Sequence, residues 1–520
     1  MRKRILNIVR RDYNENADKN REYENIRCAF DMEPKEEYSL DDQTWDDLGM
    51  DMVFKKLDRA YSSLGETVLY SMLRKPSEDI MELKNRDMVI ESIKSDSYLR
   101  ERLQCIFYEL GYDSKNTFFE MMQSELIVNK FKYYLYTFIG KVCPIAAIIL
   151  IFMFGESYAI GLLLLSSLNI FINFRERYTI KSRGIIYLRN IIKASKKIAS
   201  IQHMSIKRYS DEIESNLHHV RDIDRNTLLI GFVNMWAGFF EFVSIIFLIE
   251  ECSYYKVSSV LKEKKPYILN IYNIVGELEA LLSIAGYQHN LKQKYVKPKF
   301  IQEASLNICE GVHPLIENPV PNSVKIKEKG IVLTGTNMSG KSTFLRMLGI
   351  NMVLAQTFYF VLAEDYRAGM FNIVTSISPN DDLSKGKSYY MAEAESILRI
   401  VKAMEKKRPV FCPIDEIFRG TNPIERIAMS TEILSYLNNE RSISIVATHD
   451  REIADILKGS YEFYFFSEKV DDKKGLSFDY KLKPGVSQTR NAIKLLEYIG
   501  FPKEITERAY ERAKTIEGFI

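Results

Sequence analysis

The sequence predicts a helical domain followed by an α/β domain, and three observations carry this prediction. Residues 57–76 place apolar side chains near the 3.6-residue period of a helix, and Pro76 closes the run. From about residue 320 to residue 485, short β-rich stretches alternate with glycine, proline and helical stretches, which is typical of strand–loop–helix units. Between these regions, residues 137–174 carry almost no charge, which indicates an apolar helical hairpin that interrupts the helical domain.

The composition is that of an ordinary folded protein, since 46% of the 520 residues are apolar and 27% are charged. The formal net charge is only +3, so an interaction with nucleic acid would have to rest on a local patch. The cysteines form no Cys-x-x-Cys pair, and we expect no metal site built from cysteine and histidine. We expect three segments: a polar leader without a firm element over residues 1–45, a helical domain over 46–300 with the hairpin at 137–174, and the α/β domain over 301–520.

The apolar stretch consists of two runs that are each long enough to approach the span of a membrane. TFIGKVCPIAAIILIFMF (137–154) holds one charge, and YAIGLLLLSSLNIFINF (158–174) holds none. Ten Lys or Arg residues against one acidic residue follow between residues 175 and 208, whereas the connector GES has no basic residue. This asymmetry places both ends of the hairpin inside. We expect a membrane hairpin, with the protein at the cytoplasmic face of the cell membrane. The alternative is a hairpin buried in the core of a soluble, cytoplasmic protein.

The most specific motif is GTNMSGKS (335–342), a full match to G-x-x-x-x-G-K-[ST] between the strand-like IVLT and a helical stretch. Its glycines let backbone N–H groups surround phosphate oxygens, and the helix N-terminus adds a favourable dipole. Lys341 would reach the β- and γ-phosphates of ATP, and Ser342 would bind Mg²⁺. The predicted ATP-binding residues are Gly335, Thr336, Asn337, Met338, Ser339, Gly340, Lys341, Ser342 and Thr343.

Two later strands end in residues that suit ATP hydrolysis. PVFCPIDEI (409–417) ends in Asp415, which would help to hold Mg²⁺, and Glu416, which would orient or deprotonate the attacking water. SISIVATHD (442–450) ends in His449, which could sense the γ-phosphate. Glu416 and His449 are therefore the predicted catalytic residues. Taken alone, the acidic pair could also be a solvated turn, but its position after a phosphate loop favours the catalytic interpretation.

A polar stretch that contains glycine, SPNDDLSKGKSYYMAEAESI (378–397), precedes a helix. Ser384, Gly386 and Ser388 resemble a signature loop that caps ATP from a partner subunit. Under this interpretation one chain cannot complete a site, so we expect a homodimer.

A third apolar run, residues 227–251, contains Asn234 and Glu241. A third membrane span would place the downstream phosphate loop on the side of the membrane that lacks ATP. We therefore expect this run to form a buried or interfacial helix of the soluble part.

At these motifs the chain resembles the MutS family of DNA mismatch repair ATPases over nearly all of its last 220 residues. Two substitutions, Thr336 and Ser339, depart from the family's usual GPNMGGKST, and Glu425-Arg426 replaces the Asp-Gly that follows the acidic pair. The resemblance implies an ABC-type P-loop ATPase domain, an all-α lever domain ahead of it, C-terminal dimerisation helices, ATP with Mg²⁺, and DNA as a ligand. The segments that carry it are GTNMSGKSTFLR, NDDLSKGKSYYMAE, DEIFRGTNPIERIA and VATHDREI.

We expect no counterpart of the family's mismatch-reading and connector domains in this sequence, because the 45 residues ahead of the lever are too few for them. We therefore expect a membrane-anchored, dimeric MutS-like ATPase whose ATP-driven closure moves the helical levers. The basic residues 175–208 could contact DNA phosphates or anionic lipid, and their position beside the hairpin favours lipid. The alternative is a soluble ATPase that binds DNA mismatches or junctions, with the hairpin as protein core. A transport motor is disfavoured, since one hairpin offers no translocation path.

Overall fold

The computed structural model of the chain divides into two compact units. Unit 1 contains residues 1–34, 57–72 and 88–290, and unit 2 contains residues 35–56, 73–87 and 291–520. The structure describes residues 2–15, 23–32, 35–113, 116–123, 129–176, 182–223, 239–336, 339–377, 389–418, 421–438, 441–471, 475–486 and 492–515. The sequence places the change from helical to α/β structure at residue 300, whereas the units divide at residue 290 and unit 2 also takes two earlier segments.

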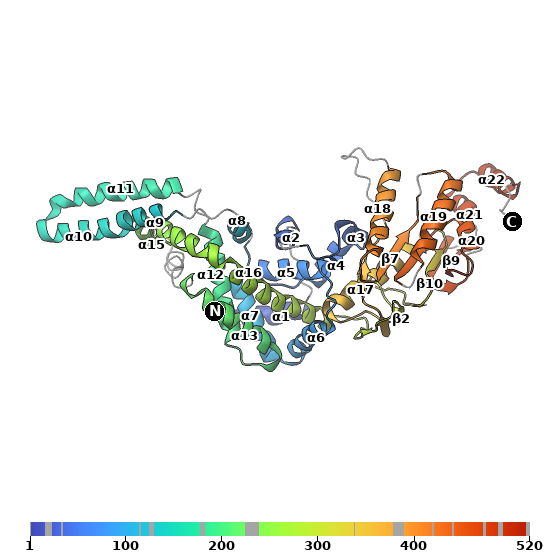
Figure 1. The fold of residues 1–520 in the computed structure, drawn as a ribbon, viewed down its shortest axis with the longest axis horizontal. Coiled ribbons are helices and arrows are strands. Elements are labelled where there is room, and N and C mark those ends of the chain that lie inside the picture. The colour runs from blue at the N-terminus through green and yellow to red at the C-terminus, as the bar shows by residue number, and fades with distance from the viewer. Residues whose placement is uncertain are drawn as a thin grey trace. The chain divides into compact units, whose positions relative to one another are not determined.

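Unit 1 is helical throughout its described residues, and helix α16 (Ile249–His289) is its longest element. Much of α16 is buried, so its apolar residues form core (Figure 1). Two helices, α5 (Ser63–Arg74) and α6 (Ile80–Ser95), cross the boundary between the units. The remaining helices of unit 1 are α1 (Arg2–Asn14), α2 (Tyr23–Met32), α7 (Ser97–Leu110), α8 (Thr117–Gln123), α9 (Lys130–Thr137), α10 (Cys143–Phe154), α11 (Ala159–Glu176), α12 (Ser182–Ala199), α13 (Lys207–His219) and α15 (Phe239–Ile246), with short turns η1 (Phe138–Val142), η2 (Glu156–Tyr158) and η3 (Met204–Ile206).

A buried glutamate joins α5 to α16. The Glu279 carboxylate accepts hydrogen bonds from the backbone N–H groups of Tyr61, at 2.6 Å, and Ser62, at 3.1 Å. Gly65 leaves the room for this carboxylate, because a Cβ there would lie 2.4 Å from Glu279 Cδ. These bonds replace the water that a buried carboxylate loses, so Glu279 can fix the start of α5 against the core helix.

Helix α1 corrects the expectation of no element in the first 45 residues. Ile5, Val9 and Tyr13 recur every four residues and are buried, while charged residues surround them in the sequence. Three buried positions in 13 residues form a weak periodic signal, and their burial depends on helices that come later in the chain.

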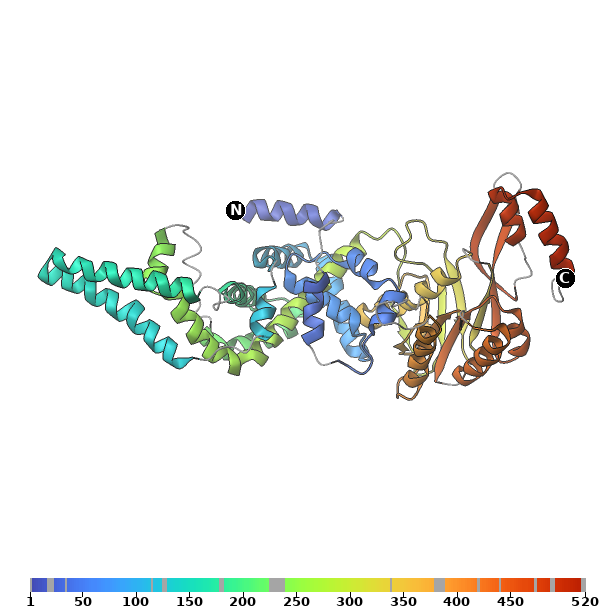
Figure 2. The same cartoon turned by 90° about the horizontal axis from the view of Figure 1, so that it is seen from above.

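The apolar stretch forms a helical hairpin, as the sequence predicts. The π-helical turn η1 continues α9 into α10, Gly155 turns the chain with φ at 94°, and α11 returns beside α10 (Figures 1 and 2). Helical stretches 130–154 and 156–176 are long and apolar enough to cross a membrane, and only 11% and 6% of their apolar windows are buried. For the third apolar run, α15 and the start of α16 are helical, while residues 224–238 lie outside the described part.

Unit 2 is built on a sheet of six strands in the order β10-β9-β4-β8-β7-β6. The strands are parallel except for the edge pair β9 and β10, and a second sheet has the order β1-β5-β2-β3. The strands are β1 (Lys299–Phe300), β2 (Leu306–Gly311), β3 (Asn322–Ile326), β4 (Ile331–Thr334), β5 (Asp365–Ala368), β6 (Asn372–Ile373), β7 (Val410–Asp415), β8 (Ser442–Ala447), β9 (Glu462–Asp471) and β10 (Gly475–Pro484).

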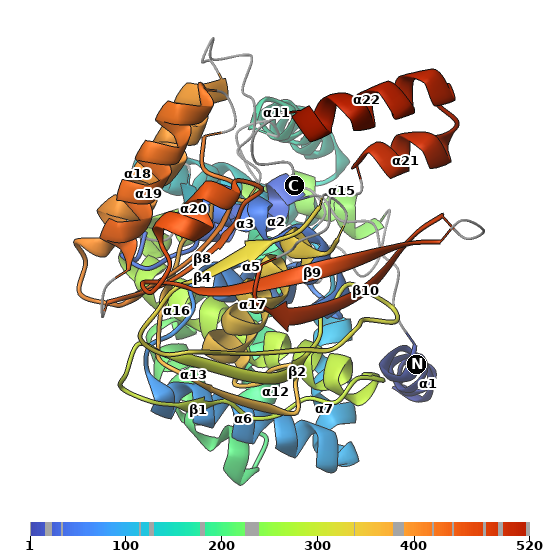
Figure 3. The same ribbon diagram turned by 90° about the vertical axis from the view of Figure 1, so that its right-hand side faces the viewer.

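Helices cover both faces of the six-stranded sheet, with α17 (Lys341–Phe358) on one face (Figure 3). The other face carries α18 (Tyr389–Met404), α19 (Pro423–Leu437) and α20 (Arg451–Ile456), whose apolar residues pack with those of β4, β7 and β8. The remaining helices of the unit are α3 (Asp42–Asp47), α4 (Met50–Leu57), α21 (Ala492–Ile499) and α22 (Lys503–Thr515). Because β4, β7 and β8 are parallel, their carboxyl ends meet at one edge, where such sheets bind ligands.

Candidate nucleotide site

The phosphate-loop motif lies between β4 and α17, in the strand–loop–helix context that the sequence predicts. Gly335 and Gly340 have φ angles of 141° and 111°, which side chains other than glycine rarely adopt. A Cβ on Gly335 would also lie 2.9 Å from the carbonyl oxygen of Phe466. Ser339 is buried, whereas Asn337 and Met338 lie outside the described residues. The loop geometry therefore requires both glycines.

The amino group of Lys341 lies in the curve of the loop. It donates to the carbonyl oxygens of Gly335, at 2.8 Å, and Thr336, at 3.0 Å, and the side chain is 5% exposed. A buried ammonium held by loop carbonyls is positioned to exchange these partners for phosphate oxygens of a bound nucleotide.

The two predicted metal ligands, Ser342 and Asp415, lie at the start of α17 and at the end of β7. The Ser342 hydroxyl donates a hydrogen bond to the Asp415 carboxylate. One hydroxyl and one carboxylate, from adjacent elements, form an oxygen donor set that suits a small hard cation such as Mg²⁺. The two side chains therefore fit a Mg²⁺ bound together with nucleotide phosphates.

Glu416 and His449 form a pair at the same edge of the sheet. His449 Nε2 lies 3.0 Å from Glu416 Oε1, although the residues follow different strands. The backbone of Glu416 has a φ of 63°, and its N–H donates to the Ala447 carbonyl at 2.9 Å. A left-handed conformation at a residue other than glycine costs about 1–3 kcal/mol and is often found at functional sites. Glu416 follows β7 directly in this strained conformation.

Six of the predicted site residues line one cavity of about 930 Å³, and they are Gly340, Lys341, Ser342, Thr343, Asp415 and Glu416. His449 is not in the cavity wall and reaches the site through its contact with Glu416. The wall also contains residues that the motifs did not indicate, which are Gly311, His313, Ile316, Asn318, Pro319, Val320, Asn322, Phe344, Met347, Ile377, Phe466 and Tyr480. A volume of this size falls in the range of small-molecule sites.

The wall residues outside the motifs come from β2, β9, β10 and the loop before β3, among other segments. Burial lowers the pKa of His313 to about 4, and the charges of Arg346 and Lys56 add to the shift. His313 is therefore neutral at pH 7 and accepts a hydrogen bond from the Leu315 N–H. Tyr480 has a φ of 52° and lies in a register shift of the β9–β10 pair, which is a signal that only the structure reveals.

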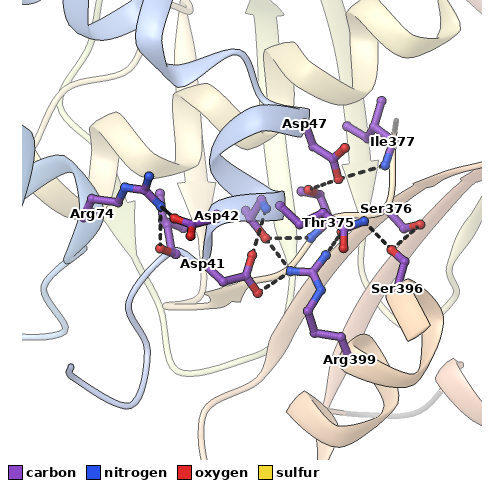
Figure 4. Close-up of polar contacts among 12 residues, drawn as sticks. Asp41, Asp42, Asp47, Arg74, Thr375, Ser376, Ile377, Ser396 and Arg399 are labelled. Atoms are coloured by element: carbon purple, nitrogen blue, oxygen red, sulfur yellow. Dashed lines mark hydrogen bonds and ion pairs between the residues drawn. The ribbon is translucent and has the colours of Figure 1, made fainter. Parts of the chain in front are cut away.

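A polar cluster around α3 supports the region next to the cavity (Figure 4). The Asp47 carboxylate accepts from the Thr375 hydroxyl at 2.7 Å and from the Ile377 N–H at 3.0 Å. Arg399 on α18 donates to the Thr44 hydroxyl at 3.0 Å and also contacts Asp41 and the Thr375 carbonyl. Residues 35–56 belong to unit 2 because these bonds, made with segments more than 300 positions away, anchor them there.

The same cluster explains how the ends of the predicted signature segment are held. Ser384, Gly386 and Ser388 lie outside the described residues, so their predicted role is untested. Ser376 and Ile377 precede that stretch (378–397), and Ser396 lies at its C-terminal end, on α18. The Ser396 hydroxyl donates to the Ser376 hydroxyl at 2.8 Å, which ties the two sides together.

The sheet order and the residues at its edge are those of an α/β domain of the ATPase type. A family model described as MutS domain V matches residues 331–517 of the chain. The family resemblance seen in the sequence is thereby confirmed.

Curated relatives that carry the name DNA mismatch repair protein MutS match about half of the chain. The protein of one Thermus thermophilus strain is 32% identical over 240 residues, which cover 45% of this chain and 29% of the relative. The protein of Thermus aquaticus is 30% identical over 264 residues, 50% of this chain and 32% of the relative. The protein of Fusobacterium nucleatum is 29% identical over 281 residues, which cover 52% of this chain and 31% of the relative. The chain thus matches about three tenths of the length of these relatives.

Proposed function

We propose that this protein binds and hydrolyses ATP as a membrane-anchored, dimeric member of the MutS family. The observation that carries the proposal is the convergence of three predicted functional groups at one edge of the sheet. They are Lys341 in its loop, the Ser342–Asp415 pair, and the Glu416–His449 pair. In the same proposal, ATP binding favours closure of the dimer, and this closure moves the helical unit.

The cavity supports a simple division of roles among its residues. Loop N–H groups and Lys341 bind the phosphates, and Ser342 and Asp415 would hold Mg²⁺, which neutralises charge on the β- and γ-phosphates when bound. Glu416 orients the attacking water and accepts its proton, since its carboxylate lies in the cavity wall. His449 keeps this carboxylate in place through the 3.0 Å contact.

Dimerisation is supported by apolar residues at the C-terminal end of the chain. Helices α21 and α22 pack on each other and lie beyond β10 (Figure 3). Four large apolar side chains on and between them are exposed: Tyr498, Ile499, Phe501 and Ile505. Such a cluster is typical of an interface, and we propose that a second copy of the chain covers it and completes each ATP site from its signature segment.

Membrane anchoring is supported by the exposure of the hairpin. Large apolar side chains on α10 and α11 face outward, among them Ile145, Ile149, Phe152, Leu163, Leu164, Leu168 and Phe171. At the start of the hairpin, Lys132 donates to the buried Glu176 carboxylate at 2.7 Å, so charged groups are paired where the two helices join unit 1. We propose that the hairpin enters the cell membrane from its cytoplasmic face.

The basic segment 175–208 supports lipid more than DNA as its partner. Lys193 and Lys196 on α12 are exposed, but Lys197 pairs with Glu109, and Arg208 lies 3.7 Å from Glu212. Because some of these cations are paired with acidic residues, they form a weak site for DNA phosphates. Binding to anionic lipid beside the hairpin requires only a few exposed cations. DNA binding, as in the mismatch repair proteins to which the chain is similar, is the second candidate.

Charged residues in the hairpin are expected to release the protein from membranes. In the Leu163→Arg/Leu164→Arg variant, each arginine adds about 2.5–3.5 kcal/mol to the cost of membrane insertion. Flotation of cell lysates on a density gradient should find the unaltered protein with lipid vesicles and the variant at the bottom. Met204→Arg alters an exposed methionine outside the hairpin and serves as the control that still floats. Unaltered protein that does not float would favour the soluble alternative.

The proposed function is tested by the ATPase rate of the full-length protein in lipid nanodiscs. The rate is measured with neutral or anionic lipid, and with or without duplex DNA, at one salt concentration. We expect turnover that rises with anionic lipid and does not respond to DNA. Stimulation by DNA that fades with added salt would instead identify DNA as the ligand of the basic segment. Absence of turnover under all four conditions would contradict the ATPase proposal.

A further inference from the structure

An ion pair joins α19 to the turn that carries His449. Arg426 Nε donates to Asp450 Oδ2 at 2.9 Å, and Arg426 Nη2 donates to Asp450 Oδ1 at 2.5 Å. Both side chains are largely shielded, with 23% and 18% of their area exposed. Two parallel bonds between a guanidinium and a carboxylate fix orientation as well as distance. This pair can therefore set the position of the residues next to Asp450.

Both oxygens of the Asp450 carboxylate accept hydrogen bonds from Arg426. Asp450 stands at the N-cap position of α20, where an aspartate usually accepts from the first backbone N–H groups of the helix. Its side chain makes no such capping bond, because both oxygens accept from Arg426. The backbone N–H of Asp450 donates to the buried Thr448 hydroxyl at 3.1 Å, so the turn is held on both sides of His449.

The pair closes a ring of contacts around the proposed catalytic residues. Glu416 and Arg426 lie ten positions apart on one stretch of chain, and His449 and Asp450 are neighbours on another. His449 contacts Glu416, and Asp450 contacts Arg426, so the two stretches are cross-linked twice. The family pattern has glycine where this chain has Arg426, and glycine has no side chain that could make the second link.

We propose that Arg426 is a positioning residue for the Glu416–His449 pair and that it acts through Asp450. The proposal rests on the proposed ATPase function and adds a residue that is not in the wall of the cavity. With Arg426 in place, the turn at His449 cannot move away from the strained Glu416. Without it, His449 gains freedom and Glu416 loses its support, while the phosphate loop and the Ser342–Asp415 pair stay unchanged.

The test compares Arg426→Gln, Asp450→Asn and the double variant as full-length proteins in nanodiscs. A small displacement of catalytic groups should lower kcat for ATP hydrolysis roughly 10- to 100-fold. The KM for ATP should change less than about twofold, because no group that binds phosphate is altered. The double variant should be no slower than either single variant, since both remove the same link. Arg426→Lys should recover only part of kcat, because an ammonium cannot form the two parallel bonds.

A second measurement reports on the freedom of His449 and does not require ATP hydrolysis. Reaction of histidines with diethyl pyrocarbonate, measured by peptide mass spectrometry, should be faster at His449 in Arg426→Gln than in the unaltered protein. His218 is exposed in unit 1 and should react equally in both proteins. A purely structural role would instead lower the Tm and expose the buried His313 to the reagent, which would overturn the proposal.

The outcomes separate this inference from the ATPase proposal. Unaltered kcat and unaltered His449 reactivity in both single variants would show that Arg426 positions nothing. If the unaltered protein hydrolyses no ATP, the ATPase proposal fails, and the His449 reactivity still decides whether Arg426 holds the turn. Lys294→Gln removes an exposed ion pair to Glu364 elsewhere in unit 2 and is the matched control for loss of a surface charge.

Discussion

Replacement of Lys341 by alanine is expected to abolish ATP binding. The Lys341 ammonium lies inside the phosphate loop, within hydrogen-bond distance of the Gly335 and Thr336 carbonyls. Hydrogen bonds to charged groups each contribute about 1.5–3 kcal/mol, so loss of two phosphate contacts should weaken binding by at least about 100-fold. Equilibrium titration with a fluorescent ATP analogue in nanodiscs measures the change in Kd.

The control for this prediction is Lys294→Ala, since Lys294 is an exposed lysine of the same unit that pairs with Glu364. Its Kd for the analogue should equal that of the unaltered protein. A Lys341→Ala variant that binds ATP with unaltered affinity would show that the nucleotide occupies another site. In that case the cavity of about 930 Å³ would need a different ligand.

Replacement of Glu416 by glutamine is expected to separate ATP binding from hydrolysis. The amide keeps the size of the side chain but cannot accept the proton of the attacking water, and general bases contribute roughly 10²–10⁴-fold to rate. We expect kcat to fall by this factor, while the Kd for ATP stays within about threefold, since Lys341 and Ser342 are unaltered. The variant should also accumulate as an ATP-bound closed dimer, detected by size-exclusion chromatography with light scattering.

Glu364→Gln provides the matched control, because this glutamate is exposed and pairs with Lys294 rather than with a residue of the cavity. It should hydrolyse ATP at the rate of the unaltered protein and form no trapped dimer. Retained turnover in Glu416→Gln would overturn the role of Glu416 as the base. A variant that turns over slowly but stays monomeric would leave the role of Glu416 intact and contradict the proposed dimer.

Much of the candidate site was accessible from sequence, because its residues stand at the ends of strands that the sequence marks clearly. β7 and β8 are short, apolar and followed by polar residues, and the phosphate loop has a defined spacing. Chain order and parallel pairing then place Asp415, Glu416 and His449 at one edge of the sheet. Local pattern sufficed here, since β7 and β8 are buried along nearly their whole length and are rich in apolar residues.

Residues that reach the site from distant parts of the chain could not be predicted in this way. Phe466 and Tyr480 come from an antiparallel edge pair whose register shift brings Tyr480 to the cavity. Asp47 reaches Thr375 and Ile377 across more than 300 positions of sequence. No spacing rule connects such residues, because their contacts arise only when separate elements pack.

Arg426 shows the same difference between what the sequence reveals and what only the structure reveals. The sequence shows that arginine stands where the family pattern has glycine. The structure shows a different local partner, Asp450, which makes two hydrogen bonds with Arg426. A side chain as long as that of arginine can reach many neighbours, so its partner depends on how α19 packs against α20.

The sequence by itself determined the phosphate loop, the acidic pair, the histidine after β8, the helical hairpin and the resemblance to the MutS family. These features depend on local spacing and apolar periodicity, which are properties of the sequence itself. Only the tertiary structure decided that α1 is a helix, that residues 35–56 belong with the α/β unit, and that Arg426 pairs with Asp450 beside His449. The physical reason is that burial and side-chain pairing in these three cases join segments that are far apart along the chain, and such contacts have no signature in local sequence.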